Sequence, residues 1–146
     1  MKPNILITDI DGFIGNSLKD HFINQGFKVF GTIYFKDPEN EREIKFNILK
    51  KEDFSKLWKD KEFEVILHTI GLVDQNQPYK SKYAINSCGT KDLCGYAKSI
   101  GCEHFIFTCS VSIFCSKVMG ENRTEEQTKK DLLPHMENLK LSQKNL

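Results

Sequence analysis

The sequence lacks several features that define large classes of proteins. No apolar run approaches the ~20 residues that cross a bilayer, and Met1 to Thr8 lead into a strand-like segment that does not resemble a signal peptide. Proline and glycine are scarce, at 4 and 9 of 146 residues, which argues against a fibrous or disordered chain. We therefore expect a globular cytoplasmic protein.

An excess of charge of one sign is also lacking. The 21 Lys and Arg nearly cancel the 20 Asp and Glu, which gives a formal net charge of +1. Because no field of one sign surrounds such a molecule, it has no general attraction for polyanions. We expect neither nucleic acid nor a membrane as a partner.

No arrangement of cysteine or histidine resembles a metal site. The five cysteines lie within one third of the chain, none at the two-residue spacing of zinc and redox motifs, and the 4 histidines are scattered. An odd number of cysteines in a chain that is not exported indicates free, mostly buried thiols. We predict no metal site. The cysteines are Cys88, Cys94, Cys102, Cys109 and Cys115.

Short apolar runs alternate with longer segments whose apolar residues recur every three or four positions. This alternation is typical of a parallel α/β sheet. With right-handed crossovers it predicts a doubly wound, Rossmann-like sheet of order 3-2-1-4-5 in three αβα layers. The expected strands are 4–8, 27–34, 44–48, 65–70 and 105–109, and the expected helices are 13–25, 52–61, 82–99 and a weak one from about 131.

The turn after the first strand carries glycine at two of the three positions of a dinucleotide-binding loop. Asp9 takes the first position, and Gly12 and Gly15 take the others. In such a sheet this turn lies at the ligand crevice, and the amides that begin the next helix face the anion. Taken alone, the motif fits a dinucleotide turn and a plain tight strand-to-helix connection equally well.

Two carboxylates in this turn complicate its interpretation. Asp9 adds like-charge repulsion near a pyrophosphate and narrows the turn, so we expect it to weaken the site without abolishing it. The spacing of Asp9 and Asp11 is also compatible with a metal-dependent phosphotransferase. The helical phase and the Gly-Phe-Ile-Gly sequence that follows favour the dinucleotide turn.

Four separated segments lie in the order and near the spacing of one protein family. They are 5–8 (ILIT) with 11–15 (DGFIG), 65–73 (VILHTIGLV), 86–90 (NSCGT) and 105–114 (FIFTCSVSIF). Together they resemble the extended short-chain dehydrogenase/reductase family, in its NAD-dependent epimerase/dehydratase group. The resemblance covers only the N-terminal Rossmann portion of that family, as far as about residue 116.

This resemblance implies a dinucleotide cofactor, NAD or NADP with NAD slightly favoured, and roles for particular residues. Capping or turn formation is the simpler role for Asn86, and a buried hydrogen bond is the simpler role for His68. The residues implied are Gly12, Phe13, Ile14 and Gly15 at the pyrophosphate, Asn47 and Ile48 beside the adenine, Thr69, Ile70 and Gly71 on the nicotinamide ribose side, and Asn86 at the cofactor loop.

The resemblance also exposes a missing catalytic pair. The family uses a tyrosine as general acid/base and a lysine four residues later that lowers its pKa, but the sequence contains no Tyr-x-x-x-Lys. Ser110 matches the hydroxyl residue that hydrogen-bonds the reacting group, although it can equally form a turn. His135 stands at the tyrosine position and can exchange protons near neutral pH, although a solvated histidine is its more ordinary role.

The acid expected after the second strand is missing as well. Ile33 stands at the position where an acid binds the ribose in NAD-dependent relatives, and Lys36 follows shortly after it. An acid there would favour NAD, and a cation there would accept a 2′-phosphate. The residues alone therefore leave the choice of cofactor open.

Three functions remain open. The first is an NAD(P)-dependent epimerase, dehydratase or reductase that transfers a hydride to or from a nucleotide sugar or another small alcohol or carbonyl. The second is a catalytically deficient relative that binds a nucleotide or a partner, and the third is a remnant that binds nothing. We expect one domain over 1–146, with a polar loop and terminal helix from about 117, no substrate subdomain, and an uncovered sheet edge that favours self-association or a protein partner.

Overall fold

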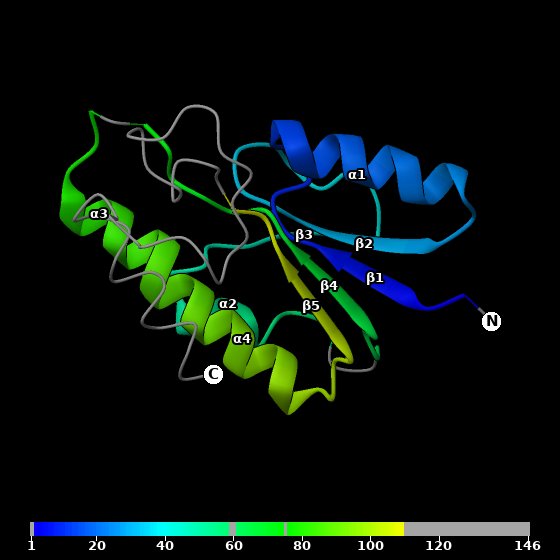
Figure 1. Cartoon of the computed structure of the whole chain (residues 1–146). Coiled ribbons are helices and arrows are strands. Elements are labelled where there is room, and N and C mark those ends of the chain that lie inside the picture. Colours follow the sequence, from blue (N-terminus) through cyan, green and yellow to red (C-terminus); the bar gives the residue numbers. More distant parts are fainter. Residues whose placement is uncertain (1, 59–60, 75, 110–146) are drawn as a thin grey trace, which may run out of the picture. The chain divides into compact units, whose positions relative to one another are not determined.

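Strands and helices alternate along the chain in the computed structural model (Figure 1). The structure describes residues 2–58, 61–74 and 76–109. The chain divides into two units, Met1–Thr108 and Cys109–Leu146, and all the elements below belong to the first. Ser110, His135 and the predicted terminal helix lie outside the described residues, and the single domain over 1–146 stays a prediction.

Five parallel strands form one sheet in the order β3-β2-β1-β4-β5, which confirms the predicted Rossmann-like topology. Every strand ends before its predicted carboxyl end, because the residues that follow leave the ladder at the edge where a ligand crevice forms. The strands are β1 Asn4–Ile7, β2 Lys28–Ile33, β3 Glu43–Lys45, β4 Val65–His68 and β5 His104–Phe107.

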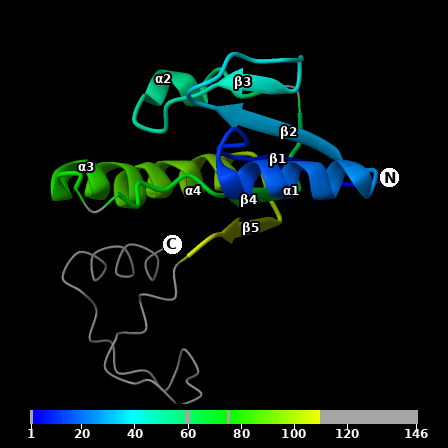
Figure 2. The same cartoon turned by 90° about the horizontal axis from the view of Figure 1, so that it is seen from above.

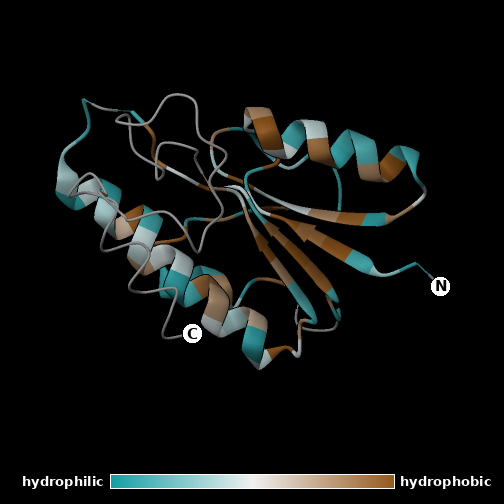
Figure 3. Cartoon of the chain, viewed as in Figure 1, coloured by the Kyte–Doolittle hydropathy of each residue, from teal (hydrophilic) through white to brown (hydrophobic). Residues whose placement is uncertain are grey.

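The three central strands, β2, β1 and β4, are buried on both faces, which explains why they are mostly apolar. In β1, Ile5 and Ile7 pack in a cluster with Phe22 of α1 (Phe13–Asn24), whereas Leu6 packs in another with Ala97 of α4 (Thr90–Ser99). The hydropathy colouring shows the apolar strands lying between these helices (Figure 3). The sheet is therefore the middle of three layers.

The helices depart from the prediction in two places. The segment expected over 52–61 is helical only as α2 (Lys51–Phe54), although Leu57 beyond its end is still buried. The long helix begins earlier than expected, as α3 (Tyr79–Tyr83), and continues through the π-helical η1 (Ala84–Gly89) into α4. Figure 2 shows α2 beside β3 at one edge of the sheet and β5 at the other.

The thiols correct one expectation. Four cysteines of the described residues are free, as predicted, but none is buried. Cys88 and Cys109 are exposed, and Cys94 and Cys102 are half-buried. Cys88, which the sequence predicts to be buried like the other thiols, is exposed in η1.

None of the helices in residues 2–58, 61–74 and 76–109 combines the length and hydrophobicity that a membrane crossing requires. Within the same ranges, no three side chains of His, Cys, Asp or Glu gather closely enough to hold a metal ion.

Candidate functional site

The chain leaves β1 through a tight turn that is fastened to β2. Asp9 adopts a φ of 59°, in the left-handed region that side chains rarely occupy. Its amide donates to Thr32 Oγ1 at 3.1 Å, and the amide of Ile10 donates to the Thr32 carbonyl at 2.9 Å. Gly12 is the N-cap residue of α1. Because glycine has no side chain to accept a hydrogen bond, the amides of the first helical turn are left without a side-chain acceptor.

Close approach of Asp9 explains both glycines of this turn. A Cβ on Gly15 would lie 2.0 Å from the carbonyl oxygen of Asp9, and a Cβ on Gly12 would lie 2.3 Å from Asp9 Oδ2. The first contact is with backbone, whereas the second is with a side chain that can move. A dinucleotide turn needs glycine at both places, for approach of the phosphates and for packing of the helix on the strand.

The carboxyl group of Asp9 lies beside these glycines in an unusual state. Burial, strengthened by the nearby negative charge of Asp11, raises the pKa of Asp9 to about 6. The group is therefore largely charged at pH 7.5 and largely neutral below pH 5.5. Any anion at the turn meets a repulsion that depends on pH.

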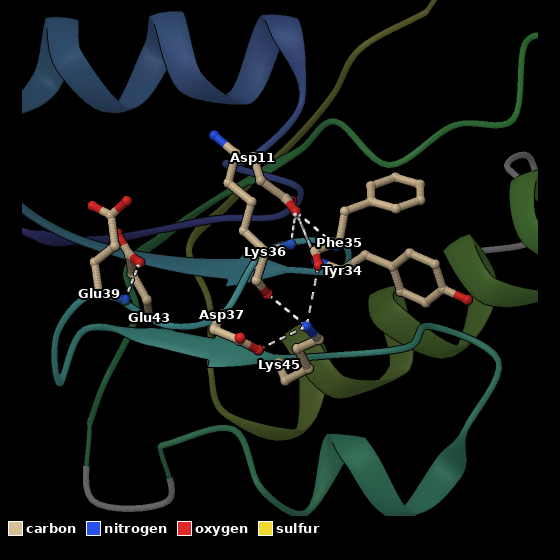
Figure 4. Close-up of polar contacts among 8 residues, drawn as sticks. All are labelled: Asp11, Tyr34, Phe35, Lys36, Asp37, Glu39, Glu43 and Lys45. Atoms are coloured by element: carbon tan, nitrogen blue, oxygen red, sulfur yellow. Dashed lines mark hydrogen bonds and ion pairs between the residues drawn. The ribbon is translucent and has the colours of Figure 1, made fainter.

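Asp11, in the same turn, extends its carboxylate to the loop after β2. Its carboxylate accepts from the backbone amides of Tyr34, Phe35 and Lys36, at 3.1, 2.8 and 3.2 Å (Figure 4). Burial acts to raise the pKa of Asp11, but the amide hydrogen bonds together outweigh it and lower the pKa. Asp11 is thus a fixed negative charge at neutral pH. Ile33, at the position of the family's acid, is 3% exposed and packs in the core.

A cavity of about 240 Å³ opens beside the turn, at the carboxyl ends of the strands. Its lining includes four residues that the sequence assigned to the cofactor: Asn47, Ile48, Ile70 and Gly71. The remaining lining residues are Asp9, Thr32, Ile33, Tyr34, Phe35, Phe46, Leu49, Leu72 and Ile85.

Asn47 is held rigidly at this cavity. The backbone N–H of Asn47 donates to the buried carboxylate of Asp53 at 2.8 Å, and the side-chain Oδ1 of Asn47 accepts from the backbone N–H of Leu49 at 3.0 Å. A hydrogen bond to Lys56, opposed by burial and aided by the amide of Asn47, lowers the pKa of Asp53 and keeps it charged. The side-chain amide of Asn47 is therefore held in one position beside the apolar residues that line the cavity.

The other assigned residues occupy different places. Phe13 and Ile14 are exposed on the first turn of α1 and do not line the cavity, and the hydroxyl of Thr69 donates to the Thr8 carbonyl. Asn86 lies inside η1 and clamps the loop after β4, because its Oδ1 accepts from the Leu72 amide at 2.7 Å and its Nδ2 donates to the Leu72 carbonyl at 3.0 Å. The loop that borders the cavity is therefore fixed from the helix.

A buried hydrogen-bonded chain supports this edge of the sheet. Thr8 Oγ1 accepts from the Thr69 amide at 3.0 Å, so we infer that its hydroxyl donates to His68 Nδ1, also at 3.0 Å. His68 Nε2–H then donates to Thr90 Oγ1 at 2.9 Å, and the ring stacks on Phe107. These hydrogen bonds connect the end of β1 with β4 and α4 through one neutral histidine.

The state of His68 predicts how stability depends on pH. Burial lowers the pKa of His68 to about 4, so between pH 6.5 and pH 4 the unfolded chain takes up a proton that the native chain does not. Stability should fall by about 3 kcal/mol through this window as pH falls. The raised pKa of Asp9 acts in the opposite direction, so the difference in unfolding free energy between wild type and His68→Gln isolates the histidine.

Chemical denaturation at pH 7.5, 6, 5 and 4 measures this difference. The substitution should remove the downward slope that the histidine contributes, and His21→Gln, on the exposed surface of α1, serves as the control. If wild type and His68→Gln lose stability in parallel as pH falls, the buried neutral histidine does not govern this window.

Comparison with known proteins decides the family. The model of the NAD dependent epimerase/dehydratase family matches residues 5–138. The chain belongs to that family. Its predicted resemblance to the extended short-chain dehydrogenases/reductases is thereby confirmed.

Individual relatives share the fold at low identity. A bifunctional UDP-glucose 4-epimerase and UDP-xylose 4-epimerase of Arabidopsis thaliana is 26% identical over 136 residues, covering 78% of this chain and 38% of that protein. A short-chain dehydrogenase/reductase superfamily protein of Agrobacterium tumefaciens, solved with bound NAD, has a TM-score of 0.80 at 19% identity, covering 97% of this chain and 43% of that one. UDP-glucose 4-epimerase of Thermotoga maritima, solved with UDP-glucose, has a TM-score of 0.80 at 18% identity, covering 97% and 49%.

The chain thus spans less than half of the length of these relatives. Membership of the family and the Rossmann-like fold are shown over this portion. Its residues depart from the family's pattern at the acid/base pair, at the acid after β2 and at Asp9, which takes the place of the first glycine of the turn.

Proposed function

We propose that this chain binds a nicotinamide dinucleotide across the carboxyl edge of its sheet. The observation that carries the proposal is the tight turn before α1, where a Cβ on Gly12 or Gly15 would collide with Asp9 and where the first helical amides have no side-chain cap. Such a turn suits a pyrophosphate, because phosphate oxygens can then reach the uncapped amides of the first helical turn. The family and the solved relative with bound NAD support this cofactor.

The cavity supports a place for the adenine. Its lining residues include Tyr34, Phe35, Ile48 and the loop after β4, together with Asn47, whose side chain is fixed by a hydrogen bond. An adenine ring fits between apolar walls and exchanges hydrogen bonds with an amide. The nicotinamide end would then extend toward Ile70 and Gly71.

We further propose that the chain is the cofactor-binding portion of an enzyme that acts on a nucleotide sugar. The bound dinucleotide supplies the hydride acceptor for oxidation of a substrate hydroxyl. Ser110 would hydrogen-bond the reacting oxygen, and His135 would take the proton that the missing tyrosine takes in relatives. The absence of Tyr-x-x-x-Lys favours a second candidate, a relative that binds the cofactor without turnover.

Two measurements separate these proposals. Calorimetric titration of NAD⁺ and NADH into the pure chain should show saturable binding tighter than ~1 mM. Incubation of the NAD⁺ complex with UDP-glucose and UDP-xylose then decides between enzyme and binder. Turnover that His135→Ala abolishes supports the enzyme, binding without turnover contradicts catalysis by this portion on its own, and absence of binding contradicts both candidates.

A further inference from the structure

The loop after β2 holds an anion that belongs to the chain itself. Three successive backbone amides, those of Tyr34, Phe35 and Lys36, converge on the carboxylate of Asp11. Successive amides aimed at one point form an anion-binding concavity. Here the concavity is filled from the glycine turn, by a residue 23 to 25 positions earlier in the chain.

A lysine fixes the same loop from the other side. Lys45 Nζ on β3 donates to the carbonyls of Phe35 and Lys36 at 3.3 and 2.6 Å and to Asp37 at 3.3 Å. Figure 4 shows Asp11 and Lys45 on opposite sides of the loop. The peptide groups therefore present N–H toward Asp11 and C=O toward Lys45, and the concavity is held in its filled form.

This loop is where a dinucleotide-binding sheet distinguishes the two cofactors. The segment after the second strand meets the adenine ribose, where an acid accepts from a 2′-hydroxyl and a cation accepts a 2′-phosphate. Ile33 cannot replace that acid, because its hydrocarbon side chain has no hydrogen-bond acceptor, and it is buried in the core. Asp11 brings a carboxylate to the same place from the turn.

We propose that Asp11 makes this chain select NAD over NADP, replacing the acid that β2 lacks. Its carboxylate can accept a hydrogen bond from a 2′-hydroxyl. A 2′-phosphate would meet a fixed negative charge and would find the amides of the loop already occupied. The low pKa of Asp11 keeps that charge in place at neutral pH. This inference rests on the proposed dinucleotide site.

Calorimetric titration of NAD⁺ and NADP⁺ at pH 7.5 tests the inference. Wild type should bind NAD⁺ about tenfold more tightly than NADP⁺, and Asp11→Asn should bring the two dissociation constants within about threefold of each other. Asp20→Asn removes an equal charge from the exposed surface of α1 and should leave the ratio unchanged. A wild-type preference for NADP⁺, or a ratio that Asp11→Asn does not change, overturns the inference and points to Lys36 instead.

A second measurement covers the case in which Asp11→Asn disturbs the loop. 5′-AMP and 2′,5′-ADP differ only at the 2′ position, so the wild-type chain, without any substitution, should bind 5′-AMP more tightly, with a preference that shrinks as salt screens the carboxylate. An equal affinity for the two nucleotides contradicts the role of Asp11 even when NAD⁺ binds. Failure of every nucleotide to bind contradicts the proposed function, and the inference then fails with it.

Discussion

Replacement of Gly15 by alanine should destabilise the chain by about 2–3 kcal/mol and weaken NAD⁺ binding at least tenfold. The new Cβ would lie 2.0 Å from the carbonyl oxygen of Asp9 and 3.0 Å from Ile10 Cα. Both atoms belong to the backbone of the turn, so α1 must move away from β1. That movement displaces the amides that would hold the pyrophosphate. Thermal unfolding and calorimetric titration measure the two effects.

The chain provides a matched control for this substitution. Gly95 lies in α4, and a Cβ there has no neighbour within 4 Å. Gly95→Ala should therefore stabilise the helix by about 0.5–1 kcal/mol and leave NAD⁺ binding unchanged. Should Gly15→Ala fail to fold, Gly12→Ala gives the same test more mildly, because its closest contact is the movable carboxylate of Asp9. A Gly15→Ala variant with wild-type stability and affinity would contradict this account of the turn.

Replacement of Asp9 by glycine should tighten NAD⁺ binding about tenfold at pH 7.5. The carboxyl lies within the turn, and its pKa of about 6 leaves it charged at that pH. In the wild type, affinity should rise as the pH falls from 7.5 to 5.5, because the proton removes the repulsion. In Asp9→Gly the affinity should vary little over this range.

Asp9→Asn separates charge from backbone strain. Asparagine tolerates the left-handed φ of 59° about as well as aspartate does, so this variant removes the charge and keeps the conformation. It should reproduce the tighter, pH-independent binding, whereas the gain in unfolding free energy from relieved strain should appear only in Asp9→Gly. A wild-type affinity that is flat with pH would show that Asp9 does not face the bound anion.

The strands and their order could be predicted because burial on both faces makes the central strands mostly apolar and because crossovers are right-handed. The carboxyl ends of the strands could not be predicted. Ile48 and Ile70, which the sequence pattern includes in the third and fourth strands, lie beyond the ends of β3 and β4 and line the cavity. Apolar residues that serve a ligand cavity cannot be distinguished by sequence pattern from those that serve a sheet.

The two glycines of the turn were likewise predictable, from their spacing between a strand and a helix. The hydrogen bonds of Asp11 could not be predicted. Its partners are backbone amides of another loop, and the sequence does not show which backbone amides a side chain will bind. The two signals that could have suggested the role of Asp11 are the acid in the turn and the missing acid at Ile33. The π-helical η1, which carries Asn86 to the Leu72 backbone, also has no pattern in the sequence that distinguishes it from α-helix.

The central claim is that a dinucleotide lies across the carboxyl edge of the sheet, with its pyrophosphate at the turn before α1. The most direct test is a two-dimensional amide NMR titration of the ¹⁵N-labelled chain with NAD⁺. The account predicts the largest shift changes at the amides of residues 12–15, 47–49 and 70–72. Saturable changes confined to other parts of the chain, or no change at millimolar NAD⁺, would contradict it.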